Sequence, residues 1–268
     1  GDFTLAENSP CIGSGENGTD IGALGVGCNI AFGGSIWYVS TTGSDDQGYG
    51  TLENPYQTIQ KGLDMSAMSG DTILLSNGEY NQSVLLNENK SVTISSNYIF
   101  ENDTNYINNT KIKINLNSGW STRADSVYVI GLSFMDHDDH GTSFVDRSNY
   151  LQISHCKFKN NSGTLFLEDG EKIIKNSTFE NNGDSLSITG AIFFNSGGKL
   201  LVENSIFKNN YGQYGGGIYF KGDSGFVENC YFYNNIASHP SDDHGNTGDG
   251  GACLLYTSDA ADDCLRVD

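Results

Sequence analysis

A four-residue repeat constrains the fold of this chain more than any other feature of its sequence. The tetrad Phe-x-Asn-Asn occurs four times, with 21, 28 and 25 residues between successive phenylalanines, at 158–161, 179–182, 207–210 and 232–235. A glycine-rich step follows three of the tetrads, at 190–192, 215–218 and 250–252. Self-similarity at a period of roughly 20–50 residues is typical of solenoids, in which each repeat forms one turn.

The apolar segments within each repeat are too short to be helices. One repeat contains them at 200–202, 206–207 and 218–220, separated by Gly, Asn or Asp. Such runs predict strands. Stacking the repeats about 4.8 Å apart pairs each strand with its equivalent in the next turn, and parallel crossovers are nearly always right-handed. We therefore predict an all-β, right-handed parallel β-helix with coils of 21–28 residues. The tetrad Phe should form an internal column and an Asn a ladder in the turn.

These motifs carry a family resemblance. The repeat resembles the pectate-lyase-like right-handed β-helix superfamily, and its Phe-x-x-Asn and Gly-rich rhythm also resembles secreted bacterial β-helix proteins with polymorphic outer-membrane, adhesin-like repeats. The superfamily includes lyases, hydrolases, epimerases and non-enzymatic adhesins, so the resemblance implies a fold rather than an activity. It also implies a bacterial protein that is secreted or exposed on the cell surface, with its signal peptide missing from this fragment.

The chain divides into four expected parts. Residues 1–28 resemble the closing segment of a preceding β-helix domain, 29–36 a linker, and 37–252 a β-helix domain with regular repeats over 127–252. Tyr56, Ile59, Leu63 and Ala67 recur at helical spacing, which predicts a capping helix at about 56–68 over the open end of the solenoid. The Asn-rich stretch 97–110 is interpreted as a side loop.

The last part has an unusual sequence. Residues 253–263 resemble a translated sequencing adapter, so 253–268 are expected to be a non-native tail, in which Cys253 and Cys264 would not be biological and the solenoid would lack its C-terminal cap. At the other end, Cys11 and Cys28 bracket the first segment and either form a local disulfide or remain two thiols.

The charge limits the class of partner. The chain has 14 Lys and Arg against 33 Asp and Glu, a net charge of −19. This balance excludes nucleic acid and makes an acidic polysaccharide an awkward ligand unless cations bridge the charges. No apolar run reaches membrane-spanning length, which predicts no membrane span. We expect the protein to be a monomer and its partner to be a polysaccharide or cell-surface glycan.

Two loops carry the same acidic tetrapeptide. Asp138 and Asp139 precede one His-Gly pair, and Asp242 and Asp243 precede the other. Paired carboxylates suit calcium binding or acid–base catalysis, so calcium is the possible cofactor. The alternative, which we favour, is a polar surface loop. Four coils would separate the two tetrapeptides by about 19 Å, too far for one shared site.

The candidate base for lyase chemistry is Lys221, which follows a glycine-rich strand. A lone lysine is usually a solvated surface charge. The sequence contains no complete signature of a pectate lyase, a polygalacturonase or an alginate epimerase. If there is catalysis, the candidates are therefore Asp242, Asp243 and Lys221.

An aromatic row is the candidate ligand-binding feature. Aligning the coils on the glycine-rich step stacks the aliphatic residues Leu165, Ile192 and Ile218, and beside them the aromatic residues Phe166, Phe193 and Tyr219. Because strand side chains alternate between faces, inward aliphatics would place the aromatics outward, where they could stack on sugar rings. A register shifted by one residue would instead bury the aromatics. All these positions are apolar, so periodicity does not decide between the two.

Three functions remain open from the sequence. The first is a non-catalytic, adhesin-like or carbohydrate-binding module at the cell surface, which the missing catalytic constellation and the regular coils favour. The second is a polysaccharide lyase or glycoside hydrolase acting in a groove on the parallel sheet. The third is a purely structural stalk.

Cys156 and Cys230, at equivalent repeat positions about 14 Å apart, are expected to be small core residues rather than a disulfide.

Overall fold

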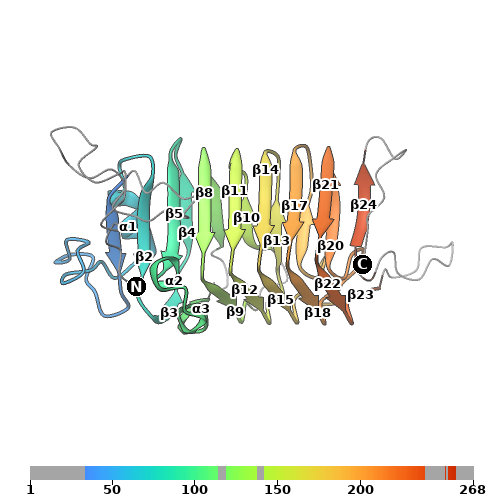
Figure 1. The fold of residues 1–268 in the computed structure, drawn as a ribbon, viewed down its shortest axis with the longest axis horizontal. Coiled ribbons are helices and arrows are strands. Elements are labelled where there is room, and N and C mark those ends of the chain that lie inside the picture. The colour runs from blue at the N-terminus through green and yellow to red at the C-terminus, as the bar shows by residue number, and fades with distance from the viewer. Residues whose placement is uncertain (1–33, 114–118, 138–141, 239–250, 252, 258–268) are drawn as a thin grey trace, which may run out of the picture.

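The predicted parallel β-helix is confirmed. A computed structural model describes residues 34–113, 119–137, 142–238, 251 and 253–257. Within these residues the chain forms an all-β parallel solenoid of about 6 coils with three short helices. Figure 1 shows the coils side by side, with the chain advancing along one axis from β1 to β24.

Three parallel sheets run the length of the solenoid. Sheet A has eight strands: β1 (Ile36–Val39), β2 (Asp71–Leu75), β5 (Ser91–Ser96), β8 (Ser126–Ile130), β11 (Tyr150–Ser154), β14 (Glu171–Lys175), β17 (Lys199–Glu203) and β21 (Ser224–Glu228). Sheet B has seven strands: β3 (Gly78–Asn81), β6 (Thr110–Lys113), β9 (Ser133–Met135), β12 (Lys157–Lys159), β15 (Thr178–Glu180), β18 (Ile206–Lys208) and β22 (Tyr231–Tyr233).

Sheet C also has seven strands: β4 (Val84–Asn87), β7 (Trp120–Arg123), β10 (Thr142–Asp146), β13 (Thr164–Leu167), β16 (Ile192–Phe194), β20 (Ile218–Gly222) and β24 (Cys253–Thr257). A small pair, β19 (Tyr211–Gly212) and β23 (Ile236–Ala237), lies between sheets B and C along the chain. From β2 onward each coil contributes one strand to each large sheet, so a residue's neighbours across the sheet are its equivalents in adjacent coils.

The phenylalanines of the tetrads form the predicted internal column. From Phe134 through Phe158, Phe179 and Phe207 to Phe232, successive ring centroids lie 4.8, 4.8, 4.8 and 4.7 Å apart with interplanar angles of 7° or less. This spacing is the strand separation of a sheet. The rings therefore stack because the parallel register places identical residues on one another, and Phe179 and Phe207 are completely buried.

The last asparagine of each tetrad forms the predicted ladder. Asn161 donates its side-chain amide to the side-chain oxygen of Asn182 at 2.9 Å, and Asn182 does the same to Asn210 at 2.9 Å. Asn210 continues to Asn235 at 2.8 Å. Each amide also donates to the carbonyl of a Phe in the preceding coil. The ladder thus satisfies polar groups that would otherwise be buried without partners at this corner.

Left-handed residues make the other corner positions. The first asparagine of the tetrad has φ near +50° in all four repeats, at 160, 181, 209 and 234. The residue two positions before each sheet B strand of these coils has the same conformation, at 155, 176, 204 and 229. Asparagine tolerates this conformation better than most residues because its short side chain bonds locally. The glycine-rich step requires glycine for lack of space rather than for positive φ. A Cβ on Gly190 would lie 2.0 Å from the carbonyl oxygen of Gly216 in the next coil.

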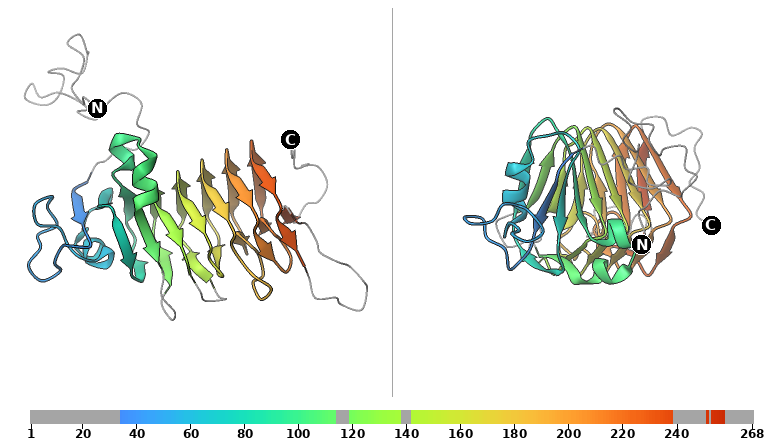
Figure 2. Two further views of the ribbon diagram at one scale, coloured as in Figure 1. Left: turned by 90° about the horizontal axis from the view of Figure 1, so that it is seen from below. Right: turned by 60° about the vertical axis from the view of Figure 1, so that its left-hand side comes forward.

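The predicted capping helix is present but shorter than expected. Helix α1 spans Ile59–Met65 and buries Ile59, Gly62 and Leu63 against the first coil. Tyr56 is not helical and instead bridges Val39. Residues 57 and 58 stay outside the helix because their amides donate to the carboxylate of Asp45. Figure 2 shows α1 at the end of the solenoid that carries β1.

The interpretation of 97–110 as a side loop is wrong. The segment folds into α2 (Tyr98–Glu101) and α3 (Thr104–Asn109), which project from the side of the solenoid (Figure 2). Tyr98 and Ile107 pack on Ile130 of sheet A's outer surface in a small apolar cluster of their own. These tertiary contacts stabilise helices that an Asn-rich sequence does not favour by itself.

The ends of the chain are described only in part. Residues 1–33, including Cys11, Cys28 and most of the expected linker, lie outside the described residues. Cys253–Thr257, where the expected tail begins, form β24 and pair in parallel with β20. The adapter-like origin of the tail stays a prediction. Cys156 is completely buried and Cys230 half-buried, and both are free thiols, as predicted for small core residues.

Candidate functional site

The outer face of sheet C carries the predicted aromatic row. Leu165 pairs with Ile192, Ile192 pairs with Ile218, and these aliphatic residues are at most 2 % exposed. The adjacent positions pair Phe166 with Phe193 and Phe193 with Tyr219. Because neighbouring strand residues point to opposite faces, the buried aliphatic column places the three aromatics on the outside. The register shifted by one residue is therefore excluded.

The three rings form a closely packed row rather than a flat platform. Phe166 and Phe193 lie 5.1 Å apart at 82°, and Phe193 and Tyr219 lie 5.0 Å apart at 78°. These edge-to-face pairs are a favoured aromatic arrangement. Phe193, in the middle, is only 8 % exposed, whereas Phe166 and Tyr219 are half-buried. Phe166 and Tyr219 therefore present ring surface to solvent two coils apart, and Phe193 supports both.

A polar row runs beside the aromatic row. Three of its members, Glu168, Asn195 and Lys221, follow the aromatic residues by two positions along the chain. The fourth, Arg147, has the same position in the preceding coil, where it follows Val145, the partner of Phe166. Arg147 forms an ion pair with Glu168 and lies over the ring of Phe166, 6.0 Å from its centroid. Asn195 donates to the other carboxylate oxygen of Glu168 at 3.3 Å. Lys221 is exposed at the end of this row.

Two loops lie along one side of the aromatic row on sheet C. Residues 183–190 and 211–217 precede β16 and β20, and they are joined by backbone hydrogen bonds from Gln213 to Ser187 and from Tyr214 to Ile188. The ring of Tyr214 lies 6.0 Å from that of Tyr219. Leu186 and Ile188 are 62 % and 45 % exposed. The aromatic row is therefore flanked by polar side chains on one side and by partly apolar loops on the other.

The predicted carboxylate sites lie outside the described residues. Asp138, Asp139, Asp242 and Asp243 all fall in segments that the structure does not describe. Among the described residues no three His, Cys, Asp or Glu side chains lie together as a metal site would require. Calcium binding at the two acidic tetrapeptides, and a catalytic role of Asp242, Asp243 and Lys221, stay predictions.

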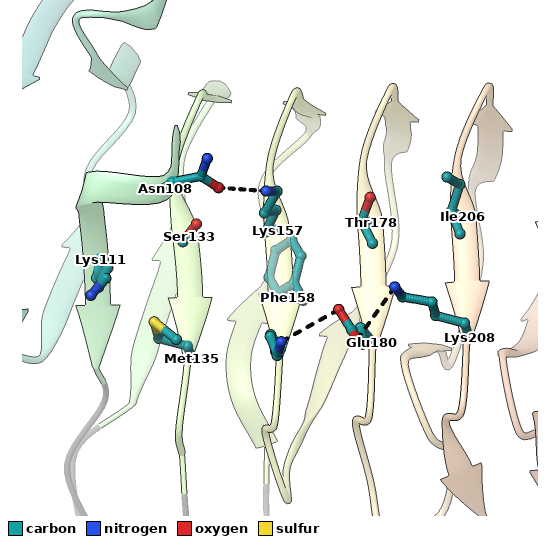
Figure 3. Close-up of a pocket in the computed structure, with 11 residues that line it drawn as sticks. Asn108, Lys111, Ser133, Met135, Lys157, Phe158, Thr178, Glu180, Ile206 and Lys208 are labelled. Atoms are coloured by element: carbon teal, nitrogen blue, oxygen red, sulfur yellow. Dashed lines mark hydrogen bonds and ion pairs between the residues drawn. The ribbon is translucent and has the colours of Figure 1, made fainter. Parts of the chain in front are cut away.

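Sheet B carries a second feature, which sequence reasoning missed. A recess of about 350 Å³ lies on its outer face, lined on one side by Asn108 of α3 and along its length by alternating outward residues of β6 to β18. Four lysines line this recess: Lys111, Lys157, Lys159 and Lys208. Figure 3 shows Lys111, Lys157 and Lys208 on alternate strands along its length. A signal was present in the sequence, because residues on either side of an inward Phe must point outward, and two such positions flank Phe158 as lysines.

Comparison of the chain with protein-family models, with curated proteins and with solved structures finds no match. The parallel solenoid therefore rests on the structure itself, and membership of the pectate-lyase-like superfamily stays a prediction. No helix within the described residues has both the length and the apolar character needed to cross a lipid bilayer.

Proposed function

We propose that this protein is an extracellular or cell-surface module that binds a polysaccharide, without cleaving it, on the outer face of sheet C. The observation that carries the proposal is the outward aromatic row of Phe166, Phe193 and Tyr219 beside the polar row that ends at Lys221. Aromatic rings contribute apolar contact area at low conformational cost. Neighbouring amide, carboxylate and ammonium groups supply hydrogen bonds for hydroxyl groups.

The spacing of the exposed rings supports an elongated ligand. Phe166 and Tyr219 lie on β13 and β20, with β16 between them, so they are separated by about 10 Å along the solenoid axis. A glycan chain lying along that axis would contact both rings. The polar row runs in the same direction, because both rows follow the stacking of the coils. Binding along the axis lets the ligand contact side chains of several successive coils.

Retention on insoluble glycans tests the proposal. The full chain is mixed with a panel of plant and algal polysaccharides, with and without calcium, and the bound fraction is measured. Tyr219→Ala and Phe166→Ala should reduce retention on any glycan that the wild type binds by about tenfold, since one stacking contact contributes on the order of 1 kcal/mol or more. Tyr49→Ala is the matched control, because Tyr49 is 72 % exposed and lies between β1 and α1, at the opposite end of the solenoid from β20 (Figure 1).

Three outcomes separate the alternatives. Equal retention of wild type and both sheet C variants would refute binding on this face. Soluble oligosaccharide products that disappear on Lys221→Ala would instead support the lyase or hydrolase. Failure to bind any glycan in the panel would favour the structural stalk.

A further inference from the structure

The outer face of sheet B concentrates positive charge on an acidic protein. Lys111, Lys113, Lys157, Lys159 and Lys208 all point outward from β6, β12 and β18. Among the described residues, the carboxylates that contact them are Glu79, Asp136 and Glu180. Within this part of the chain five lysines therefore meet three carboxylates, and the face is net positive although the chain as a whole has a charge of −19.

The lysines recur on every second coil. Strand pairing places Lys157 beside Ser133 and Lys159 beside Met135, while Glu180 separates Lys159 from Lys208. The lysines of β6, β12 and β18 are therefore separated by about 10 Å along the solenoid axis. The side chains of Lys159 and Lys208 are 44 % and 38 % exposed, so their ammonium groups reach solvent.

The recess between these lysines has an apolar floor and a polar wall. Its floor includes Met135 and the edge of Phe158, and Ile206, 42 % exposed, lies at one end. On the wall, the side chain of Asn108 accepts a hydrogen bond from Lys157 at 2.5 Å, which positions that ammonium group over the recess (Figure 3). Glu180 lies between Lys159 and Lys208 and holds both in place.

We infer that this recess is a second binding site, on a different sheet from the aromatic row, and that its ligand is a linear acidic polysaccharide with one or two anionic groups on each disaccharide. Lysines about 10 Å apart match a chain whose charges repeat once per disaccharide. The Met and Ile surfaces fit the C–H faces of sugar rings. Nucleic acid fits poorly, because duplex DNA carries a charge every ~1.7 Å and the acidic remainder of this protein repels so dense a polyanion.

Titration of the full chain with soluble glycans tests the inference. The probes are hyaluronan, which carries a carboxylate on each disaccharide; chondroitin sulfate, which adds a sulfate; and neutral dextran. We expect both acidic probes to bind at low salt, with affinity falling as sodium chloride is added, and dextran not to bind at this site. Binding of chondroitin sulfate alone would assign the site to sulfate, and binding of both would assign it to the carboxylate.

Paired variants locate the site. Lys157→Gln combined with Lys159→Gln should weaken binding about tenfold or more and flatten its salt dependence, because two of the charges that attract the acidic glycan are removed. Lys61→Gln combined with Lys199→Gln removes the same charge elsewhere and should change affinity little. Glu180→Gln should tighten binding, because it removes the carboxylate between Lys159 and Lys208.

Several results would overturn the inference. These are no binding of either acidic glycan, equal weakening by both lysine pairs, or single-stranded DNA bound as tightly as the glycans. The site does not depend on the function proposed for sheet C. Tyr219→Ala should leave acidic-glycan affinity unchanged while reducing retention on insoluble glycan, so the failure of one proposal is distinguishable from the failure of the other.

Discussion

Two oppositely charged side chains are completely buried inside the solenoid. The ammonium of Lys172 lies 2.5 Å from the carboxylate of Asp146, and both side chains are 0 % exposed. Lys172 also donates to the carbonyl of Ser148 at 2.6 Å, and Asp146 accepts from the hydroxyl of Thr122 at 2.6 Å. Burial lowers the pKa of Lys172, and the charge of Asp146 opposes that shift. The pair joins a strand of sheet A to a strand of sheet C.

Removing one member of this pair should be costly. Asp146→Ala leaves the Lys172 ammonium buried without its counter-ion, and we expect a loss of about 3–5 kcal/mol in the free energy of unfolding. Replacing both with apolar residues, Asp146→Leu and Lys172→Met, should cost much less, because no uncompensated charge remains. Urea unfolding of the three proteins measures the difference. Equal losses in the single and double variants would contradict this account.

His155 occupies a position that the other repeats fill with asparagine. Its φ is +54°, compared with +49° for Asn176 and Asn204 and +52° for Asn229. The imidazole packs 4.9 Å from the ring of Tyr98 in α2. Burial lowers the pKa of His155 below its ordinary value. The histidine is therefore explained by its contact with the α2–α3 insertion, which packs against this corner.

The lowered pKa predicts acid sensitivity. Below the ordinary histidine pKa of about 6.5 the unfolded chain is protonated at this residue while the folded chain resists protonation, so stability falls as the pH drops through that value. Above it both states are neutral and His155 contributes no pH dependence. His155→Asn should therefore lose less stability between about pH 7.5 and 5.5 than the wild type. Thermal unfolding at both pH values checks this, and identical shifts in melting temperature would contradict it.

At the scale of single elements, the asparagine ladder is the most sensitive part of the repeat. Asn182 is 2 % exposed and accepts from both the backbone and the side-chain amide of Asn161. Asn182→Ala leaves these donors buried without an acceptor, and we expect a loss of about 3 kcal/mol. The neighbouring Asn181→Gly should stay within about 1 kcal/mol of the wild type, because glycine readily adopts positive φ. Chemical unfolding compares them, and similar losses would argue against the ladder.

Elements that repeat were predictable, and elements that occur once were less so. The tetrad predicted strands β12, β15, β18 and β22 and the columns inside them, because each coil repeats the same environment. Helices α2 and α3 were missed, because contacts of Tyr98 and Ile107 with Ile130, far away in the sequence, decide their conformation. The limits of α1 also depend on tertiary contacts, since Lys90 donates to the carbonyls of Leu63 and Ser66 at its end.

At the scale of the whole molecule, stability should depend on position along the axis. In a solenoid each coil contacts only its neighbours. Phe179 is buried between two rings in the middle of the stack. Phe179→Ala should therefore lower the free energy of unfolding by about 3–5 kcal/mol. Phe232 is half-buried and packs against Phe207 as its one ring neighbour among the described residues. Phe232→Ala should therefore cost clearly less. Urea unfolding of both variants tests this, and equal costs would contradict a nearest-neighbour stack.

The fold and the inward columns were determined by the sequence itself, because the parallel register of a solenoid stacks each motif residue on its equivalent. The tertiary structure decided which face each ambiguous apolar residue occupies, since Phe166, Phe193 and Tyr219 are as apolar as their buried neighbours and only strand pairing fixes their side. It also decided where charge gathers. The net charge of −19 is a sum over the whole chain. The lysines of sheet B meet because strands far apart in the sequence, such as those of Lys111 and Lys157, lie on one face.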